Sequence, residues 1–367
     1  MKKIHTAAIY LGNTCNFDCV YCDREYIAKD IGGQNFTGHH LKLIKNYFEH
    51  VFKDDNYKIT KIALHGGEPF LFVKRMDQVL ELLKEDFLDA KGLHVTITTN
   101  ASLILKEAWF IEKWRKYLRL TFSYDFIYQK ENREEFDVYK TIELCNYYNI
   151  PIHWQFVMPI TDPKVFSLDC VKDILDKVSK CKKRSINLIP LRHHRGERKF
   201  KTFVEDLNLP QFADAFMRFI NMLYNFNIMV YIDGNYGVTD KNYFGDHYKV
   251  ILSPDGFLYP EYDFCEYKSE AYKVGQWTDG LSSNFKPTLI RNGQEEDDQI
   301  PSKCVKCPSR PLCGLKFLHK LFDTEPGEKC VQFYQIIDAM VQYTTYLHSE
   351  KSFFHHLKDD IINIAKT

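Results

Sequence analysis

This chain of 367 residues lacks any apolar run approaching the ~20 residues that a membrane-spanning helix needs. It also lacks net charge, because Lys plus Arg and Asp plus Glu both number 49. Polybasic runs, low-complexity segments, short-period repeats and a signal peptide are absent as well. No global field therefore draws the chain to nucleic acid or to an anionic membrane, and we expect neither as a partner.

Cysteine, by contrast, is plentiful. The count of 11 is odd, and no signal peptide precedes the first predicted strand, so a disulfide framework is disfavoured. Cysteines in a reducing compartment bind metal or stay buried as thiols. We therefore expect a cytoplasmic protein.

Three cysteines stand on one short segment, as Cys15-x3-Cys19-x2-Cys22, which follows the apolar run Ile9-Tyr10-Leu11. A [4Fe–4S] cluster normally takes four cysteine ligands, so three thiolates leave one iron open for another ligand. A zinc site is the alternative, although its cysteines usually come as pairs two residues apart.

Short apolar segments alternate with amphipathic stretches through the first two thirds of the chain. The predicted strands are Ile4–Leu11, Ile59–His65, His94–Thr99, Leu118–Ser123, Ile152–Met158 and Ile186–Pro190. Amphipathic helices are predicted at Met76–Phe87 and Val171–Val178, where apolar residues recur three and four apart. This alternation predicts an α/β fold of parallel βαβ units, and six strands fit an open, partial (β/α)6 TIM-like barrel better than a closed eight-stranded one.

The pattern changes after residue 200. We expect a helix at Gln211–Tyr224, a strand at Ile228–Ile232, and a hairpin over residues 250–259 that turns at Pro254-Asp255-Gly256. A further helix is predicted from Gln332 onward. The predicted domains are a barrel at residues 1–225, a smaller domain at 226–331 and a helical tail at 332–367.

Polar motifs follow several of the predicted strands, at the edge where parallel sheets place reactive groups. His65 is followed by Gly66-Gly67-Glu68-Pro69, Thr99 by Asn100, and the fourth strand ends at Ser123. Asp125, two residues later, is either part of this edge or the cap of the next helix.

Together these motifs resemble the radical SAM superfamily. The resemblance rests on the Cys15-Cys19-Cys22 spacing with Tyr21 before the last cysteine, reinforced by Gly66-Gly67-Glu68-Pro69, and covers roughly residues 4–195. An ordinary tight turn is the alternative for the second motif. The family implies that S-adenosylmethionine chelates the open iron and is cleaved reductively to a 5′-deoxyadenosyl radical, which takes a hydrogen atom from the substrate.

The resemblance also implies residue roles. The glycines let the backbone approach the cofactor, while Glu68 or nearby carbonyls accept from its ammonium group. Asn100 faces the ribose hydroxyls, Ser123 the methionyl carboxylate, and Gln155 either the cofactor or the substrate. The predicted cofactor-binding residues are Tyr21, Gly66, Gly67, Glu68, Pro69, Asn100, Ser123 and Gln155.

A second cysteine group resembles the SPASM domain of many radical SAM enzymes. Its members are Cys304, Cys307, Cys313 and Cys330. Positions that carry cysteine in the full pattern are Glu261, Gly280 and Phe317 here, which removes most ligands of the first auxiliary cluster. The resemblance therefore implies one auxiliary [4Fe–4S] cluster with four cysteine ligands, against the alternative of a four-cysteine zinc site.

Other candidate residues carry weaker signals. Cys265 is either a spare buried thiol or a hydrogen-atom donor near the substrate. Cys145, Cys170 and Cys181 are predicted to be core residues. The segment His193-His194-Arg195 follows the sixth strand and could act at the site or belong to a solvated loop.

SPASM-type enzymes mostly modify peptides or proteins, so the resemblance implies a maturase that forms a thioether, a carbon–carbon crosslink or an epimerised residue. The anaerobic sulfatase maturases are disfavoured, because Leu281 stands where they place an Asp base. The first strand begins near Met1, so we do not expect an N-terminal leader-binding domain. The expected electron donor is an external flavodoxin or ferredoxin. The alternatives are a small-molecule radical SAM oxidoreductase and a non-catalytic iron–sulfur or zinc scaffold.

Overall fold

The structure of this chain is a computed structural model that describes residues 3–19, 22, 38–53, 59, 61–132, 136–190, 207–232, 247–259, 273, 275–276, 280–281, 302–305 and 329–348. The chain divides into two compact units. Unit 1 comprises Met1–Phe122, Phe136–Ile152 and Phe244–Ile290, and unit 2 comprises Ser123–Glu135, His153–Tyr243 and Arg291–Thr367. Among the described residues, no helix has both the length and the apolarity that a bilayer crossing demands.

Parallel strands form the centre of unit 1. They are β1 (Lys3–Tyr10), β2 (Lys61–His65), β3 (His94–Thr99) and β4 (Leu118–Ser123), each paired in parallel with the next. On the other side of β1, β8 (His247–Leu252) also pairs in parallel. The sheet continues through the antiparallel strands β9 (Phe257–Tyr259), β10 (Gly275–Gln276) and β11 (Gly280–Leu281). Parallel strands joined by helices confirm the predicted α/β class.

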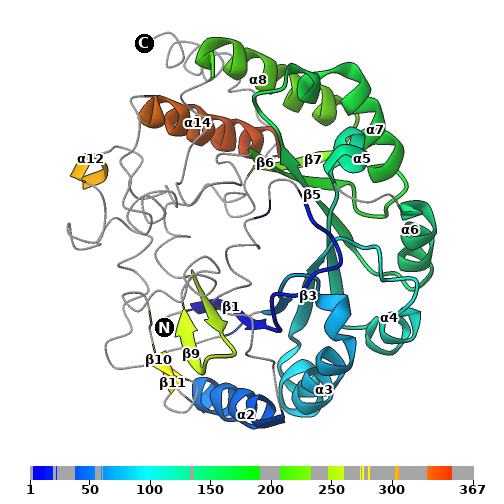
Figure 1. Cartoon of the computed structure of the whole chain (residues 1–367), viewed down its shortest axis with the longest axis vertical. Coiled ribbons are helices and arrows are strands. Elements are labelled where there is room, and N and C mark those ends of the chain that lie inside the picture. The colour runs from blue at the N-terminus through cyan, green and yellow to red at the C-terminus, as the bar shows by residue number, and fades with distance from the viewer. Residues whose placement is uncertain are drawn as a thin grey trace. The chain divides into compact units, whose positions relative to one another are not determined.

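Helices cover the strands of unit 1 on their outer side, where Figure 1 shows α2, α3 and α4. The helices of this unit are α2 (Gly38–Lys53), α3 (Val73–Leu83), α4 (Ala108–Trp114) and α6 (Val138–Tyr147). α2 buries Ile44, Tyr47, Phe48 and Val51, which recur three and four apart and so form one apolar face. Phe48 meets Phe87 at 5.4 Å between ring centroids, which anchors α2 against the segment that follows α3.

The predicted hairpin forms between β8 and β9. Gly256 adopts a φ of +86°, a conformation that glycine enters without steric cost. The Asp255 carboxylate accepts from the Phe257 backbone N–H (3.1 Å) and from the Tyr259 hydroxyl (2.8 Å). The Pro254-Asp255-Gly256 turn is therefore confirmed, and its aspartate stabilises the returning strand.

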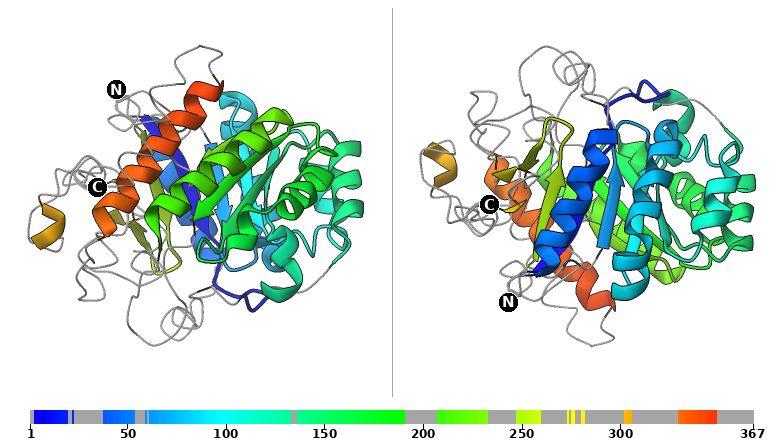
Figure 2. Two further views of the ribbon diagram at one scale, coloured as in Figure 1. Left: turned by 90° about the horizontal axis from the view of Figure 1, so that it is seen from above. Right: turned by 90° about the horizontal axis from the view of Figure 1, so that it is seen from below.

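Unit 2 carries three parallel strands, β5 (Ile152–Met158), β6 (Ser185–Pro190) and β7 (Met229–Ile232). Its main helices are α7 (Leu168–Val178), α8 (Leu209–Asn225) and α14 (Cys330–His348). α14 runs beside α8 (Figure 2), and the rings of Phe333 and Phe212 lie 5.6 Å apart between them. The predicted C-terminal helix is thus part of the core of unit 2.

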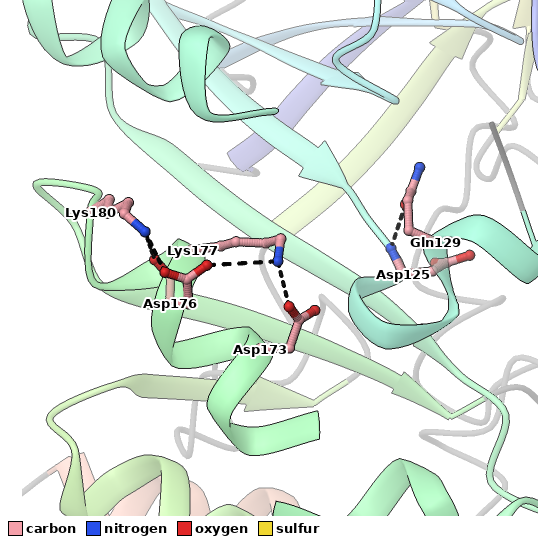
Figure 3. Close-up of polar contacts among 6 residues, drawn as sticks. All are labelled: Asp125, Gln129, Asp173, Asp176, Lys177 and Lys180. Atoms are coloured by element: carbon pink, nitrogen blue, oxygen red, sulfur yellow. Dashed lines mark hydrogen bonds and ion pairs between the residues drawn. The ribbon is translucent and has the colours of Figure 1, made fainter. Parts of the chain in front are cut away.

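A buried lysine on α7, Lys177, packs against Tyr124 within unit 2. Lys177 is 6% exposed, and its Nζ lies 2.5 Å from Asp173 Oδ1 (Figure 3). The same Nζ lies 5.8 Å from the centroid of the Tyr124 ring. The ion pair offsets the cost of burying the ammonium group, and the aromatic face adds a cation–π contact. Because Tyr124 directly precedes Asp125, this contact holds the segment around Asp125 against α7.

His94, the first residue of β3, makes the stability of the protein depend on pH. Burial, reinforced by the nearby charges of Arg119 and Lys61, lowers the pKa of His94 from 6.5 to about 4. The unfolded chain therefore binds a proton at a higher pH than the folded chain does. We expect full stability above pH 6.5 and a progressive loss as the pH falls from 6.5 toward 4.

Urea unfolding at a series of pH values tests this expectation. Replacing His94 by glutamine should flatten the curve in this window while leaving the carboxylate-driven loss at lower pH. An unchanged pH dependence in His94→Gln would show that another group is responsible.

Candidate active site

The cysteine segment follows β1 within unit 1. Cys15, Cys19 and Cys22 are each partly exposed, and the Cys22 backbone N–H donates to the Cys19 carbonyl at 3.0 Å. The Phe17 backbone N–H points at Cys15 Sγ, 3.4 Å away. Tyr21 lies outside the described residues. In the described ranges, no three His, Cys, Asp or Glu side chains lie close enough together to hold a metal ion. Whether the cysteine segment suits an iron–sulfur cluster therefore depends on the groups around the cysteines.

The Gly66-Gly67-Glu68-Pro69 turn follows β2 and packs directly on the cysteine segment. The Gly67 N–H donates to the Gly12 carbonyl and the Glu68 N–H to the Thr14 carbonyl, both at 2.9 Å. A Cβ on Gly66 would lie 2.4 Å from Gly12 O, and a Cβ on Gly67 would lie 2.4 Å from Thr14 O. The glycines therefore permit a close approach of two backbones. The group approached in the structure is the cysteine segment, and the predicted approach to the cofactor stays a prediction.

Glu68 is 1% exposed, and its carboxylate accepts hydrogen bonds from groups of the protein. Oε1 accepts from the Phe70 N–H (3.0 Å) and the Thr99 hydroxyl (2.7 Å), and Oε2 accepts from the Asn100 N–H (2.8 Å). Three donors satisfy the buried charge. Glu68 therefore caps the 3₁₀ turn Pro69–Phe72, which begins at the buried Pro69, and ties the end of β2 to the end of β3.

Asn100 extends this connection to the cysteine segment. Its Nδ2 donates to Asn16 Oδ1 at 2.9 Å and lies 3.9 Å from Cys15 Sγ. Its Oδ1 accepts from both the backbone N–H (3.0 Å) and the hydroxyl (2.7 Å) of Ser102, and Asn16 Nδ2 donates to that hydroxyl at 2.9 Å. The predicted contact of Asn100 with ribose hydroxyls stays a prediction.

Backbone strain accompanies this arrangement at Ala101. This buried residue has a φ of +67°, where a side chain costs about 1–2 kcal/mol. Its N–H donates to Thr99 Oγ1 at 2.9 Å, so the hydroxyl that donates to Glu68 also holds the turn. Strain of this kind persists only where the surrounding contacts over-determine it, and it is common at functional sites.

Ser123, Asp125 and Gln155 belong to unit 2. Asp125 is fully buried and stands before the 3₁₀ turn Phe126–Tyr128, but its side chain makes no capping hydrogen bond to that turn. Gln155 pairs in register with Asn187 on β6, and its carbonyl accepts from the Tyr124 N–H at 3.0 Å. Along β5 it alternates with buried Trp154 and Phe156, which places it on the strand's less buried face. The predicted cofactor contacts of Ser123 and Gln155 stay predictions.

The groups around the cysteines fit an iron–sulfur cluster. Cys15 Sγ faces two N–H donors, and such donors favour a thiolate over a thiol. The Nδ2 group of Asn13 is buried and finds no hydrogen-bond acceptor among the described residues. Asn13 stands two residues before Cys15, and an unmet donor on this segment suits a group that brings sulfide acceptors, as a cluster would.

Of the second cysteine group, two members are described, both in unit 2. Cys304 is buried in the short helix α12 (Ser302–Val305), and Cys330 is the first residue of α14. Cys307, Cys313 and Cys265 lie outside the described residues, as do Glu261, Phe317 and the segment His193-His194-Arg195. The auxiliary site therefore stays a prediction.

The remaining cysteines are core residues, as predicted. Cys145, Cys170 and Cys181 are at most 3% exposed. Burial raises the pKa of the Cys170 thiol to about 12 and that of the Cys181 thiol to about 11. Neither thiol forms a reactive thiolate near neutral pH.

Sequence reasoning missed three polar residues of this site: Asn13, Asn16 and Ser102. The contact of Asn16 with Asn100 crosses 84 positions of the chain, and that of Ser102 depends on the strained turn after β3. A usable signal was present, because Asn16 directly follows the first ligand cysteine and Ser102 stands two residues after Asn100, a spacing that favours side-chain to backbone hydrogen bonds.

Known proteins resemble this chain in sequence and in fold. A profile of the Radical SAM superfamily matches residues 9–207. The radical SAM cyclopropyl synthase TigE of Paramaledivibacter caminithermalis is 25% identical over 133 residues, which span 33% of this chain and only 28% of TigE.

Several solved structures share the fold, including those of anSMEcpe and SuiB. Native anSMEcpe with bound AdoMet and Cp18Cys peptide has a TM-score of 0.61 at 16% identity and covers 99% of each chain. Streptococcus suis SuiB bound to S-adenosylmethionine has a TM-score of 0.60 at 15% identity, covering 90% of this chain and 77% of SuiB, and SuiB is also known bound to the precursor peptide SuiA. At these identities the similarity establishes the fold.

Proposed function

The chain belongs to the radical SAM superfamily, and we propose that it binds a [4Fe–4S] cluster through Cys15, Cys19 and Cys22 to act on a peptide or protein. When bound, the reduced cluster splits S-adenosylmethionine into methionine and a 5′-deoxyadenosyl radical that takes a hydrogen atom from the substrate. The observation that carries this proposal is the network of Glu68 and Asn100, which joins the ends of β2 and β3 to the first cysteine.

Each part of this edge has a proposed task. Gly66 and Gly67 are partly exposed, and their carbonyls, which accept no hydrogen bond from the described residues, would accept from the ammonium group of S-adenosylmethionine. Glu68 holds the turn that presents them. Tyr21, Pro69, Asn100, Ser123 and Gln155 are the remaining proposed cofactor contacts.

We propose a peptide or protein substrate because SuiB and anSMEcpe, which share the fold, are known with bound peptides. The proposed outcomes are a thioether, a carbon–carbon crosslink or an epimerised residue. An external flavodoxin or ferredoxin would supply the electron, in the reducing environment of the cytoplasm. The proposed domains remain residues 1–225, 226–331 and 332–367.

For the C-terminal region we propose one SPASM-like auxiliary cluster held by Cys304, Cys307, Cys313 and Cys330. A full set of four thiolates leaves no open iron, so this cluster would serve electron transfer or structure. Cys265 would then be available as a hydrogen-atom donor.

Anaerobic reconstitution tests both clusters. The wild-type protein should release 5′-deoxyadenosine when dithionite and S-adenosylmethionine are added. The triple variant Cys15→Ala, Cys19→Ala, Cys22→Ala should release none and retain about four irons per chain. Cys145→Ala, which removes a buried thiol elsewhere, is the matched control and should retain iron at both sites.

Two outcomes would overturn parts of this proposal. A fully loaded wild-type protein that releases no 5′-deoxyadenosine would refute the enzymatic function. A triple variant with no remaining iron would refute the proposed auxiliary cluster. The proposal that Cys15, Cys19 and Cys22 bind the first cluster would still stand.

A further inference from the structure

Asn100 occupies a closed ring of hydrogen bonds with Asn16 and Ser102. Asn16 Nδ2 donates to Ser102 Oγ, Ser102 Oγ donates to Asn100 Oδ1, and Asn100 Nδ2 donates to Asn16 Oδ1. The second hydrogen of Asn100 Nδ2 is directed to Cys15 Sγ, 3.9 Å away. Both donors and both lone pairs of this carboxamide therefore have partners inside the protein.

The ring determines which end of the carboxamide faces the sulfur. Asn100 Oδ1 accepts from the Ser102 backbone N–H at 3.0 Å, and that group can only donate. Exchanging Oδ1 and Nδ2 would set a donor against this donor and an oxygen against Asn16 Oδ1. The positive end of the amide dipole is thus held toward Cys15.

The backbone of Asn100 is held independently. Its N–H donates to Glu68 Oε2 at 2.8 Å, and the strained Ala101 follows it. Asn100 is 7% exposed, so solvent does not compete strongly for its side chain. A dipole held this firmly needs no reorganisation when the charge on the nearby sulfur changes.

We propose that Asn100 is a positioning and tuning residue, whose side-chain N–H donates to the Cys15 thiolate and raises the reduction potential of the cluster. The proposal rests on the proposed function, because it needs Cys15 as a cluster ligand. Reduction adds negative charge to the cluster and its thiolates, so an N–H donor stabilises the reduced form more than the oxidised form. The Phe17 N–H, 3.4 Å from the same sulfur, acts in the same direction.

Two variants remove the donor in different ways. Asn100→Asp keeps the acceptors for Ser102 and replaces only Nδ2 by oxygen, while Asn100→Leu removes the dipole with nearly the same shape. Ser102→Ala is the control, because it breaks two bonds of the ring but keeps the backbone N–H that orients Asn100.

The measurement is a redox titration of the reconstituted proteins. The reduced cluster is monitored by electron paramagnetic resonance, using only the part of the signal that changes when S-adenosylmethionine is added. We expect Asn100→Asp and Asn100→Leu to lower the reduced-to-oxidised ratio at a given potential about tenfold, equal to a shift of about −59 mV for one electron. Ser102→Ala should keep the wild-type midpoint.

Three results separate the possible failures. Midpoints in both Asn100 variants equal to wild type would overturn the tuning role. An equal shift in Ser102→Ala would show a general loss of order, which also contradicts it. A wild-type protein with no S-adenosylmethionine-responsive signal would refute the proposed function itself.

Discussion

Replacing Gly67 by alanine is expected to abolish cluster assembly at Cys15, Cys19 and Cys22. The added Cβ would lie 2.4 Å from both Asn13 O and Thr14 O and 2.7 Å from Asn13 C. All three are backbone atoms of the cysteine segment, so relief requires the whole segment to move. The bonds from the Gly67 and Glu68 N–H groups to Gly12 and Thr14 would then break.

Iron and sulfide analysis after anaerobic reconstitution measures this effect. We expect Gly67→Ala to lose about four irons per chain, the content of one cluster. Gly38→Ala is the matched control, because nothing lies within 4 Å of its added Cβ and it stands in helix α2. Wild-type iron content in Gly67→Ala would show that the two backbones need not approach this closely.

The strands of this fold were predictable because each is a short apolar run that ends at a polar or glycine-containing turn. The predicted bounds of β3, β4 and β5 match the structure. β1 begins and ends one residue earlier than predicted, and β6 begins one residue earlier. β2 begins at Lys61, two residues later than predicted. The position of the cysteine segment after β1 and of the glycine turn after β2 follows from the same patterns.

Helix ends were less predictable, because capping and packing decide them. The helix predicted from Met76 begins at Val73, and beyond Leu83 its hydrogen bonding changes to a π-helical turn over Lys84–Asp89. α7 begins three residues earlier than predicted, where Ser167 accepts from the Cys170 N–H and caps the first turn.

The inner contacts of the site could not be read from the sequence. Glu68 is 32 residues from Asn100, and Cys15 is 85 residues from it, so their contacts depend on the register of β1, β2 and β3. The family resemblance directed Glu68 and Asn100 toward the cofactor. In the structure both side chains make hydrogen bonds within the protein, and their contacts with a cofactor stay predictions.

Replacing Glu68 by glutamine is expected to lower the free energy of unfolding of the cluster-free protein by about 2–3 kcal/mol. Three donors among the described residues bond to the carboxylate: the Phe70 N–H and the Thr99 hydroxyl to Oε1, and the Asn100 N–H to Oε2. A glutamine NH₂ group must replace one of these oxygens. In either orientation the NH₂ group faces a backbone N–H donor, because the Phe70 N–H donates to one carboxylate oxygen and the Asn100 N–H to the other.

Urea unfolding without iron or S-adenosylmethionine isolates this structural effect. Glu81→Gln is the control: its carboxylate is 48% exposed and pairs with Lys113 at the surface, where loss of the pair changes stability by about 0–1 kcal/mol. If Glu68 served only as an acceptor for the ammonium group of S-adenosylmethionine, Glu68→Gln would unfold like wild type and weaken cofactor binding alone. A loss of stability in the cluster-free protein instead assigns Glu68 to the connection between β2 and β3, so that the acceptors for the ammonium group are the carbonyls of the turn it holds.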